Sequence, residues 1–256
     1  MSSKLFDLNG RTALVTGGSK GLGKAMARGF AEAGANVVIV SRNEGELTAA
    51  LKDILDGTGV KGKLLVADLS KRSEAKRLAN EAVAAFGGID ILVNNAGSNV
   101  PELTEKITDD NWDRILELNL SSCMALSRAL VPQMKERKWG RIIHISSIMA
   151  LGSKEGRNAY SATKAALIGM CRAEAIDLGS FGITSNCICP GPFLTDLPGS
   201  VLTAEQKKAF AQRTALGRWG EPRELAGTAL LLASDAGSYI TGTSIVVDGG
   251  TMCRIF

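Results

Sequence analysis

The usual ligands of structural zinc are scarce in this 256-residue chain. It contains one histidine, His144, and an odd number of irregularly spaced cysteines. The five cysteines are Cys123, Cys171, Cys187, Cys189 and Cys253. Cys187 and Cys189 would lie on one face of a strand, but no further cysteine or histidine clusters with them in sequence. We therefore predict no metal site, and we interpret His144, which lies inside an apolar run, as a packed core residue.

Long apolar runs and blocks of like charge are also missing. No stretch approaches the ~18 apolar residues of a membrane span, and the opening MSSKLFDLNG lacks the apolar core of a secretory signal. The 30 basic and 26 acidic residues are scattered and give a net charge of only +4. These features argue against membrane and nucleic-acid partners. With free thiols and no export signal, we expect a cytoplasmic protein acting on a small molecule.

Short β-branched runs alternate with helical patterns along the whole chain. We predict strands at 12–15, 36–40, 63–66, 89–93, 141–145, 183–189 and 244–247. We predict helices at 22–33, 44–55, 71–86, 108–137, 157–178 and 221–233, with Pro132 kinking or interrupting the fourth. The alternation predicts one α/β domain over residues 1–256. This domain is a doubly wound Rossmann-type fold, with a seven-stranded, mostly parallel sheet and helices on both faces. Residues 193–218 break the alternation, and we interpret them as a substrate loop.

A glycine-rich turn joins the first predicted strand to the first helix. Its spacing is Gly17-x-x-x-Gly21-x-Gly23. Glycines at such a turn let the backbone approach a pyrophosphate, which then lies at the positive end of the helix dipole. A glycine-rich turn alone is often only a turn, but this strand–turn–helix context favours a dinucleotide site.

The end of the second predicted strand bears on the choice of cofactor. An acidic residue there would bind the adenosine ribose hydroxyls. This chain instead has Ser41-Arg42-Asn43, and Lys20 lies in the glycine turn. These two cations would suit a 2′-phosphate, so we favour NADP(H) over NAD(H). The alternative is that Arg42 stacks on adenine or faces solvent.

The segment from Ser147 to Lys164 carries the candidate catalytic chemistry. Tyr160 and Lys164 are four residues apart, so on a helix their side chains lie on the same face. A lysine ammonium close to a tyrosine favours the phenolate, and the pair can then exchange a proton with an alcohol or carbonyl oxygen. Ser147, just past an apolar run, could offer its hydroxyl to that oxygen. Taken alone, the Tyr–Lys pair also matches an ordinary exposed helix.

Together these motifs resemble the short-chain dehydrogenase/reductase family over essentially the whole chain. The motifs are TGGSKGLG at 16–23, Asp68-Leu69, NNAG at 94–97, Asn119, Ser147, Tyr160-x-x-x-Lys164 and Pro190-Gly191. The resemblance implies that Tyr160 is the general acid/base and that Ser147 binds the substrate oxygen. It also implies that Lys164 holds the nicotinamide ribose and that Asn119 supports a proton relay from Lys164.

The resemblance extends to the cofactor contacts. Asp68 would accept a hydrogen bond from adenine, Asn95 would line the pocket, and the backbone near Gly191 would meet the nicotinamide. The full predicted set is Gly17, Ser19, Lys20, Gly21, Leu22, Gly23, Ser41, Arg42, Asn43, Asp68, Leu69, Asn95, Ala96, Gly97, Tyr160, Lys164, Pro190, Gly191 and Thr195. Members of the family commonly form tetramers, so a homotetramer or homodimer is expected, with the helices of Asn119 and Tyr160 at an interface.

Within the family, the chain looks most like bacterial gluconate 5-dehydrogenases and 3-oxoacyl-carrier-protein reductases. The expected reaction is hydride transfer between NADP(H) and a secondary alcohol or ketone, such as gluconate/5-ketogluconate or a 3-oxoacyl compound. Gluconate-type relatives often carry arginines shortly after NNAG, whereas this chain has Ser98-Asn99-Val100-Pro101. The alternatives are an NAD-linked alcohol dehydrogenase and a non-catalytic dinucleotide-binding sensor.

Overall fold

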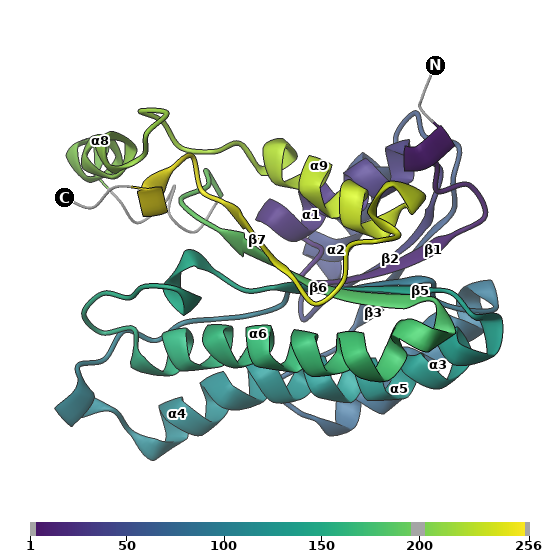
Figure 1. The fold of residues 1–256 in the computed structure, drawn as a ribbon, viewed down its shortest axis with the longest axis horizontal. Helices are drawn as coiled ribbons and strands as arrows, with labels where there is room; N and C mark the ends of the chain where they lie inside the picture. Colours follow the sequence, from purple (N-terminus) through teal and green to yellow (C-terminus); the bar gives the residue numbers. More distant parts are fainter. Residues whose placement is uncertain (1–3, 196–202, 254–256) are drawn as a thin grey trace.

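A single parallel sheet organises the molecule. The computed structural model describes residues 4–195 and 203–253. The strands are β1 (Thr12–Thr16), β2 (Asn36–Ser41), β3 (Gly62–Val66), β4 (Ile91–Asn94), β5 (Gly140–Ile145), β6 (Ile183–Pro190) and β7 (Ser244–Val247). They pair in the order β3-β2-β1-β4-β5-β6-β7, and every pairing is parallel. The predicted doubly wound sheet is confirmed (Figure 1).

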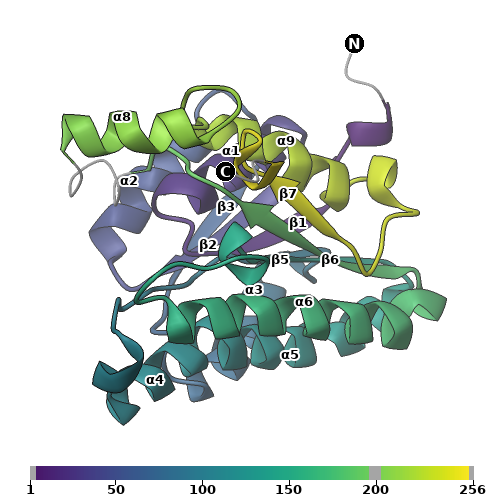
Figure 2. The ribbon, with the colours of Figure 1, turned by 60° about the vertical axis from the view of Figure 1, so that its left-hand side comes forward.

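Helices cover both faces of this sheet. Helices α1 (Gly21–Glu32), α2 (Glu44–Leu55) and α9 (Pro222–Ala233) share one hydrophobic cluster with one set of strand side chains. Helices α3 (Ser73–Phe86), α5 (Ser122–Arg137) and α6 (Asn158–Leu178) cover the opposite face. Figures 1 and 2 show these two helical layers on either side of the strands. Because both faces are covered, β1, β4 and β5 are buried at every position.

The strand order also fixes where a site can form. The chain winds outward from β1 to β3 and then returns to β4, which lies on the other side of β1. Loops that leave the carboxyl ends of β1 and β4 therefore diverge, and ligands of open α/β sheets bind in the crevice between them. The predicted glycine turn and the NNAG segment are the two loops at this point.

The predicted helix over 108–137 is not one regular helix. It consists of α4 (Asp109–Leu116), a π-helical turn, η3 (Glu117–Ser121), and α5. Pro132 does not interrupt the helix, because α5 continues through this residue. Pro132 is exposed, so the carbonyl that loses its hydrogen-bond partner can face solvent. The irregular turn lies instead at Asn119.

The predicted substrate loop contains a helix that the sequence analysis did not assign. Helix α8 (Ala204–Arg213) begins with a capping box between Thr203 and Gln206. Trp219, which is buried, packs on Phe210 with ring centroids 5.5 Å apart and donates its indole N–H to the Lys207 carbonyl at 2.9 Å. These contacts fix α8 against the body of the protein. Residues 196–202 of the predicted loop lie outside the described residues.

His144 is buried as predicted, but its environment is polar. Its Nε2 lies 2.8 Å from the Glu174 carboxylate, and its Nδ1 lies 3.2 Å from Asn94 Nδ2. Glu174 also accepts a hydrogen bond from the Ser185 hydroxyl at 2.7 Å. This network joins β4, β5 and β6 to helix α6, directly beneath the carboxyl ends of the strands.

The network favours the ionised forms of both partners. Burial opposes protonation of His144, but hydrogen bonds with Cys123 and Glu174 and the charge of Glu174 outweigh it and raise the pKa of His144 to about 10. Burial likewise opposes ionisation of Glu174, but the His144 contact outweighs it and lowers the pKa of Glu174. The sheet and α6 are thus joined by a buried ion pair.

We expect Glu174→Gln to lower the free energy of unfolding by about 3 kcal/mol at pH 7, because it leaves a buried imidazolium without its counter-charge. The pKa of His144 in the folded protein, about 10, lies above the ordinary imidazole value of about 6.5. The stabilisation that the ion pair contributes is therefore complete below about pH 6.5. It is lost as the pH rises towards the folded pKa of about 10. Urea unfolding at several pH values from 7 to 10 should show the wild type losing more stability than the variant.

The matched control is Glu32→Gln, which breaks the exposed Arg28–Glu32 pair. A surface pair of this kind contributes only about 0–1 kcal/mol. Equal effects of the two substitutions, or parallel pH profiles for wild type and Glu174→Gln, would contradict a buried ion pair.

Candidate active site

The glycine turn is built so that backbone, not side chain, faces the crevice. Gly17 and Gly21 have φ values of +64° and +51°, in the region that favours glycine. A Cβ at Gly23 would lie 2.2 Å from the Gly17 carbonyl oxygen and 2.6 Å from Asn95 Nδ2. Only glycine fits there. The first turn of α1 carries no acidic residue, and Lys20 gives its N-terminus no side-chain cap. The free N–H groups can therefore face an anion.

Thr16 locks the glycine turn to the NNAG segment. Its hydroxyl accepts hydrogen bonds from the backbone N–H groups of Asn95 and Ala96 at 2.9 and 3.0 Å. The Asn95 side chain in turn donates to the carbonyl oxygens of Thr16 and Gly17 at 2.8 and 3.2 Å. The two loops of the crevice are thus one rigid unit. Thr16 was absent from the predicted set, although its place between strand and glycine turn could have indicated it.

Arg42 and Asp68 lie at the neighbouring ends of β2 and β3. Burial tends to raise the pKa of Asp68, but hydrogen bonds from Ser70 and the charges of Arg42 and Lys71 outweigh burial and lower it. Asp68 is thus held as a carboxylate that can accept a hydrogen bond. Arg42 is exposed, so its guanidinium is accessible to a ligand.

Lys20 differs from Arg42 in having an acidic neighbour. Its Nζ lies 2.7 Å from a carboxylate oxygen of Glu46, in the first part of α2. The charge of Lys20 is therefore already compensated in part. Of the two cations predicted near the ribose, Arg42 is the better candidate for a phosphate ligand.

The π-helical turn positions Asn119 beneath the NNAG segment. Its side-chain oxygen accepts from the Ser98 N–H, and its side-chain nitrogen donates to the Ser98 carbonyl, both at 2.9 Å. The same nitrogen lies 3.2 Å from the Thr163 hydroxyl on α6. Asn119 is fully buried and ties three segments together. Ser98 and Thr163 were not predicted, because sequence gives no sign of such distant partners.

Lys164 lies where the sheet, α6 and the NNAG loop meet. Its Nζ donates to the Ile145 carbonyl oxygen at 2.7 Å and lies 5.6 Å from the centre of the Tyr160 ring. A Cβ built on Gly97 would lie 3.4 Å from this Nζ and 3.2 Å from Asn119 Oδ1. The predicted residues Asn119, Tyr160, Lys164 and Gly97 are therefore brought together.

Ser147 begins the loop after β5. Its hydroxyl accepts from the Met149 N–H at 3.1 Å and caps η4 (Ile148–Ala150). The preceding Ser146 donates to the Lys164 carbonyl at 2.7 Å. The Ser147 loop and the helix that carries Tyr160 are thus joined through Ser146, a residue that the sequence analysis did not single out.

The segment after β6 closes over the glycine turn. The Gly191 N–H donates to the Val247 carbonyl at 2.9 Å, and a Cβ at Gly191 would lie 2.5 Å from Asp248 Cβ. Thr195 lies so close to Gly21 that a Cβ there would be 3.1 Å from Thr195 Cγ2. Gly191 therefore lies against the end of β7, and Thr195 lies over the glycine turn. The contacts of Pro190, Gly191 and Thr195 to a nicotinamide stay a prediction.

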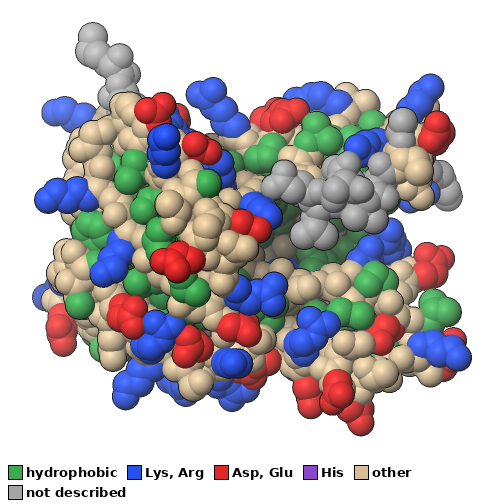
Figure 3. All heavy atoms as spheres, turned by 180° about the vertical axis from the view of Figure 1, so that it is seen from behind, with side chains coloured by type: hydrophobic (Ala, Val, Ile, Leu, Met, Phe, Trp, Pro, Cys, Tyr) green, Lys and Arg blue, Asp and Glu red, His purple; other side chains and the backbone are tan. Residues whose placement is uncertain are grey.

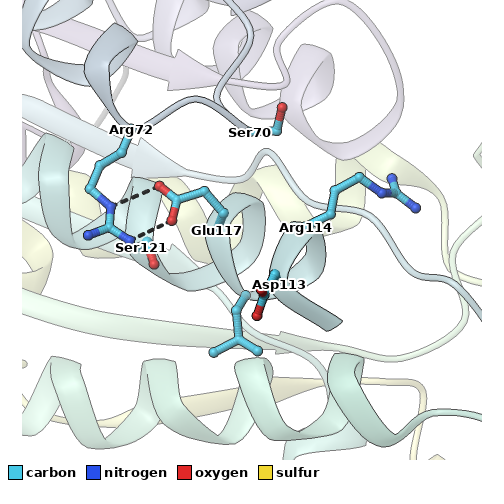
Figure 4. Close-up of a pocket in the computed structure, with 7 residues that line it drawn as sticks. Ser70, Arg72, Asp113, Arg114, Glu117 and Ser121 are labelled. Atoms are coloured by element: carbon cyan, nitrogen blue, oxygen red, sulfur yellow. Dashed lines mark hydrogen bonds and ion pairs between the residues drawn. The ribbon is translucent and has the colours of Figure 1, made fainter. Parts of the chain in front are cut away.

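A polar depression lies near the adenosine end. It is lined by Ser70, Arg72, Asp113, Arg114, Leu116, Glu117 and Ser121. Figure 4 shows Arg72 and Glu117 paired across it, with the Arg72 Nε donating to Glu117 at 2.8 Å. This pair holds the loop after β3 against the π-helical turn of Asn119. It is a structural contact at the margin of the crevice.

The remaining space suits a dinucleotide and a small substrate. Figure 3 shows a hollow with hydrophobic side chains inside and Lys and Arg side chains around its opening. The glycine cradle, the Arg42–Asp68 end and the Lys164 end fit the phosphates, adenosine and nicotinamide ribose of such a cofactor. Within residues 4–195 and 203–253, no helix could cross a membrane and no acidic, His or Cys cluster could hold a metal.

The sequence matches known proteins along most of its length. Residues 17–252 match the family model described as enoyl-(acyl carrier protein) reductase. The 3-oxoacyl-[acyl-carrier-protein] reductase FabG of Chlamydia muridarum is 38% identical over 240 residues, which cover 94% of this chain and 96% of that protein. The enzyme of the same name from Vibrio cholerae is 36% identical over 245 residues, which cover 96% of this chain and 98% of that protein.

Solved structures agree with these relatives. A 3-oxoacyl (acyl-carrier-protein) reductase from Agrobacterium tumefaciens with NADP bound has a TM-score of 0.92 at 35% identity, covering 96% of each chain. A gluconate 5-dehydrogenase from Burkholderia cenocepacia, in complex with NADP and tartrate, has a TM-score of 0.92 at 34% identity. The match covers 98% of this chain and 99% of that one. The fold, the match along the chain and these relatives lead to one conclusion: the chain belongs to the short-chain dehydrogenase/reductase family of oxidoreductases.

Proposed function

We propose that this protein is a cytoplasmic, NADP(H)-dependent reductase that interconverts a ketone and a secondary alcohol. The observation that carries this proposal is the convergence of Tyr160, Lys164 and Asn119, beside the loop of Ser147, at one end of a glycine-lined crevice. The five cysteines are free thiols, which suits a reducing compartment. The substrate is a sugar acid such as 5-ketogluconate or a 3-oxoacyl compound.

In this mechanism the chain's own residues control the proton and the geometry. Tyr160 donates its phenolic proton to the carbonyl oxygen during reduction and regains it in the reverse direction. Ser147 donates a hydrogen bond to the same oxygen and fixes its position. The Lys164 ammonium stabilises the phenolate left on Tyr160, and Asn119 holds the loop against which Lys164 rests. NADPH, when bound, would supply the hydride.

The tyrosine is the first group to test. We expect Tyr160→Phe to lower kcat by roughly 10³-fold or more, since it removes the proton donor of a general acid/base step. Fluorescence titration should show that the variant still binds NADPH with wild-type affinity, because the ring remains in place. The assay follows NADPH oxidation with 5-ketogluconate and acetoacetyl-CoA in parallel.

The second tyrosine of the chain provides the control. Tyr239 is fully exposed and lies just before β7, so Tyr239→Phe should leave kcat unchanged. Full turnover by Tyr160→Phe would exclude the proposed acid/base role.

The preference for NADP(H) rests on Arg42. The end of β2 offers no carboxylate for ribose hydroxyls, and Arg42 is exposed beside the adenosine end. A guanidinium can bind a 2′-phosphate through charge-assisted hydrogen bonds. NADP bound to the Agrobacterium and Burkholderia structures supports the same choice.

Separate titrations with NADPH and NADH test this preference. We expect NADPH to bind more tightly, and Arg42→Ala to weaken NADPH binding by roughly 10- to 100-fold through loss of a charged hydrogen bond. NADH binding should stay the same. Lys20→Ala is the comparison variant and should have a smaller effect, because Glu46 already pairs with Lys20. Equal affinities for the two cofactors would instead favour an NAD-linked dehydrogenase.

We also propose that the protein is a homodimer or homotetramer that associates through the outer face of α6. Small and apolar side chains make up most of this face, which also carries Arg172. They are Ala162, Ala165, Gly169, Ala173 and Ile176. Ile176 is 83% exposed, and a Cβ at Gly169 would meet nothing within 4 Å. An uncovered apolar helix face of this kind suits close packing against a second copy.

Sedimentation equilibrium measures the association directly. The wild type should have a mass of two or four chains, and Ala165→Arg should shift it towards the monomer by placing a charge in the interface. Ala49→Arg, on the exposed face of α2, is the matched control and should not change the mass. A monomeric wild type would refute the proposal.

A further inference from the structure

Three cations gather at the substrate end of the crevice without acidic partners. Lys154 and Arg157 lie in the loop between η4 and α6, six and three residues before Tyr160. Arg213 is the last residue of α8. Within the part of the chain that the structure describes, none of the three forms an ion pair with a carboxylate.

The ring of Phe210 holds two of these cations close together. Lys154 Nζ lies 5.4 Å from the ring centre, and Arg213 Cζ lies 5.9 Å from it. Partial burial lowers the pKa of Lys154, and repulsion from Arg157 and Arg213 lowers it further, while Glu155 opposes the shift. The net charge of the cluster is positive, and its members repel one another in the absence of an anion.

The loops that carry the cluster are those that border the predicted catalytic residues. The Glu102 N–H, in the loop after β4, donates to the Gly156 carbonyl at 3.1 Å. The backbones of Glu102 and Arg157 thereby form an isolated parallel β-bridge. The Glu102 carboxylate is engaged by Asn111 at 2.8 Å. Ser153 and Ser161 share a hydrogen bond of 2.8 Å, which fixes the loop to the first turn of α6. Figures 1 and 2 show α8 and the start of α6 at the same end of the molecule.

We propose that Lys154, Arg157 and Arg213 form a subsite for the anionic group of the substrate, a carboxylate or a phosphate, remote from the carbonyl that Tyr160 protonates. This inference rests on the proposed reductase function and specifies its substrate class. Two elements supply the subsite, the loop before α6 and the end of α8, so a bound anion would relieve repulsion between them. A guanidinium and an ammonium both pair well with these anions.

The alternative is that the three side chains are only solvated surface cations. Two observations favour a subsite. Lys154 and Arg213 both lie near the Phe210 ring, 5.4 and 5.9 Å from its centre. Arg157 lies where the backbone of the loop after β4 bridges that of the loop after β5. Substrates of open α/β sheets bind in this crevice, outside the carboxyl ends of the strands.

Steady-state kinetics with matched substrates tests the proposal. The anionic probes are 5-ketogluconate, for a carboxylate, and acetoacetyl-CoA, for a phosphate. The uncharged probe is the acetoacetyl thioester of N-acetylcysteamine. We expect Lys154→Ala and Arg213→Ala to lower kcat/KM roughly 10- to 100-fold for whichever anionic probe is the better substrate, mainly through KM. Turnover of the uncharged probe and NADPH affinity should not change.

Two further variants separate a charge effect from a packing effect. Lys154→Arg keeps the charge and should restore kcat/KM for the anionic probe. Lys135, in the last turn of α5, also lies over an aromatic ring, with its Nζ 4.3 Å from the centre of the Phe181 ring. Lys135→Ala should leave kcat/KM for the anionic probe unchanged. Equal losses for charged and uncharged probes would overturn the subsite while leaving the reductase function standing.

A binding measurement keeps the subsite testable without turnover. Calorimetric titration with gluconate and with phosphopantetheine should show binding by the wild type that Lys154→Ala and Arg213→Ala weaken. If no ketone is reduced but this binding is seen and lost in the variants, the subsite is supported and the proposed function fails. If the variants bind both anions as the wild type does, the subsite is refuted.

Discussion

The hydrogen bond from Lys164 Nζ to the Ile145 carbonyl is the contact on which the geometry of the site depends. Lys164 is only 4% exposed, and an ammonium at that depth must be compensated by acceptors. The carbonyl of Ile145, at the end of β5, supplies one. Because Lys164 and Tyr160 share one turn of α6, this contact also sets the position of Tyr160 relative to Ser147. Loss of this hydrogen bond would shift Tyr160, the proposed proton donor, relative to the end of β5.

The polar network behind Lys164 serves the same purpose from the other side. His144 and Glu174 join β5 to α6 one layer deeper, and Ser146 joins the β5 loop to the same helix. Polar contacts at two places along α6, Lys164 and Glu174, therefore fix the helix against rotation and sliding. Hydrophobic packing alone would not do this, since it is non-directional and tolerates small shifts. Oriented hydrogen bonds between helix and sheet are what a site needs when its groups must be held within a few tenths of an ångström.

The fold could be predicted from the sequence because a parallel sheet leaves a strong signal. Buried strands such as 36–40 are continuously apolar, and each is followed by a helical pattern of ordinary length. Helix α8 was missed because its stretch is polar and lies in an irregular segment. The break in the 108–137 helix was assigned to Pro132 because proline is the usual cause, whereas Asn119 carries no such local signal.

The candidate site could be predicted only in part, and the division has a physical reason. Residues that act through local geometry, such as the glycines of the turn and the Tyr160–Lys164 spacing, leave a motif. Residues that act through distant partners do not. Thr16, Ser98 and Glu174 each contact a residue 21 or more positions away, and only the three-dimensional structure identifies these partners. Lys20 belongs to the local glycine motif, but its partner Glu46 lies on α2 and was not evident from that motif.

Family membership constrains the chemistry of this protein more tightly than its substrate, because the two reside in different parts of the fold. The predicted cofactor contacts and Tyr160, the proposed proton donor, lie at strand ends and on α6, which pack against the sheet. The proposed substrate contacts come from the loops after β4, β5 and β6, and such loops can change sequence without disturbing the strands. Here the loop after β4 has no arginine, but cations lie nearby on the β5 loop and on α8. Positive charge at the substrate end is therefore supplied from neighbouring loops. A relative with the same charge on a different loop could bind the same kind of anion in another orientation, so shared fold and shared substrate must be established separately.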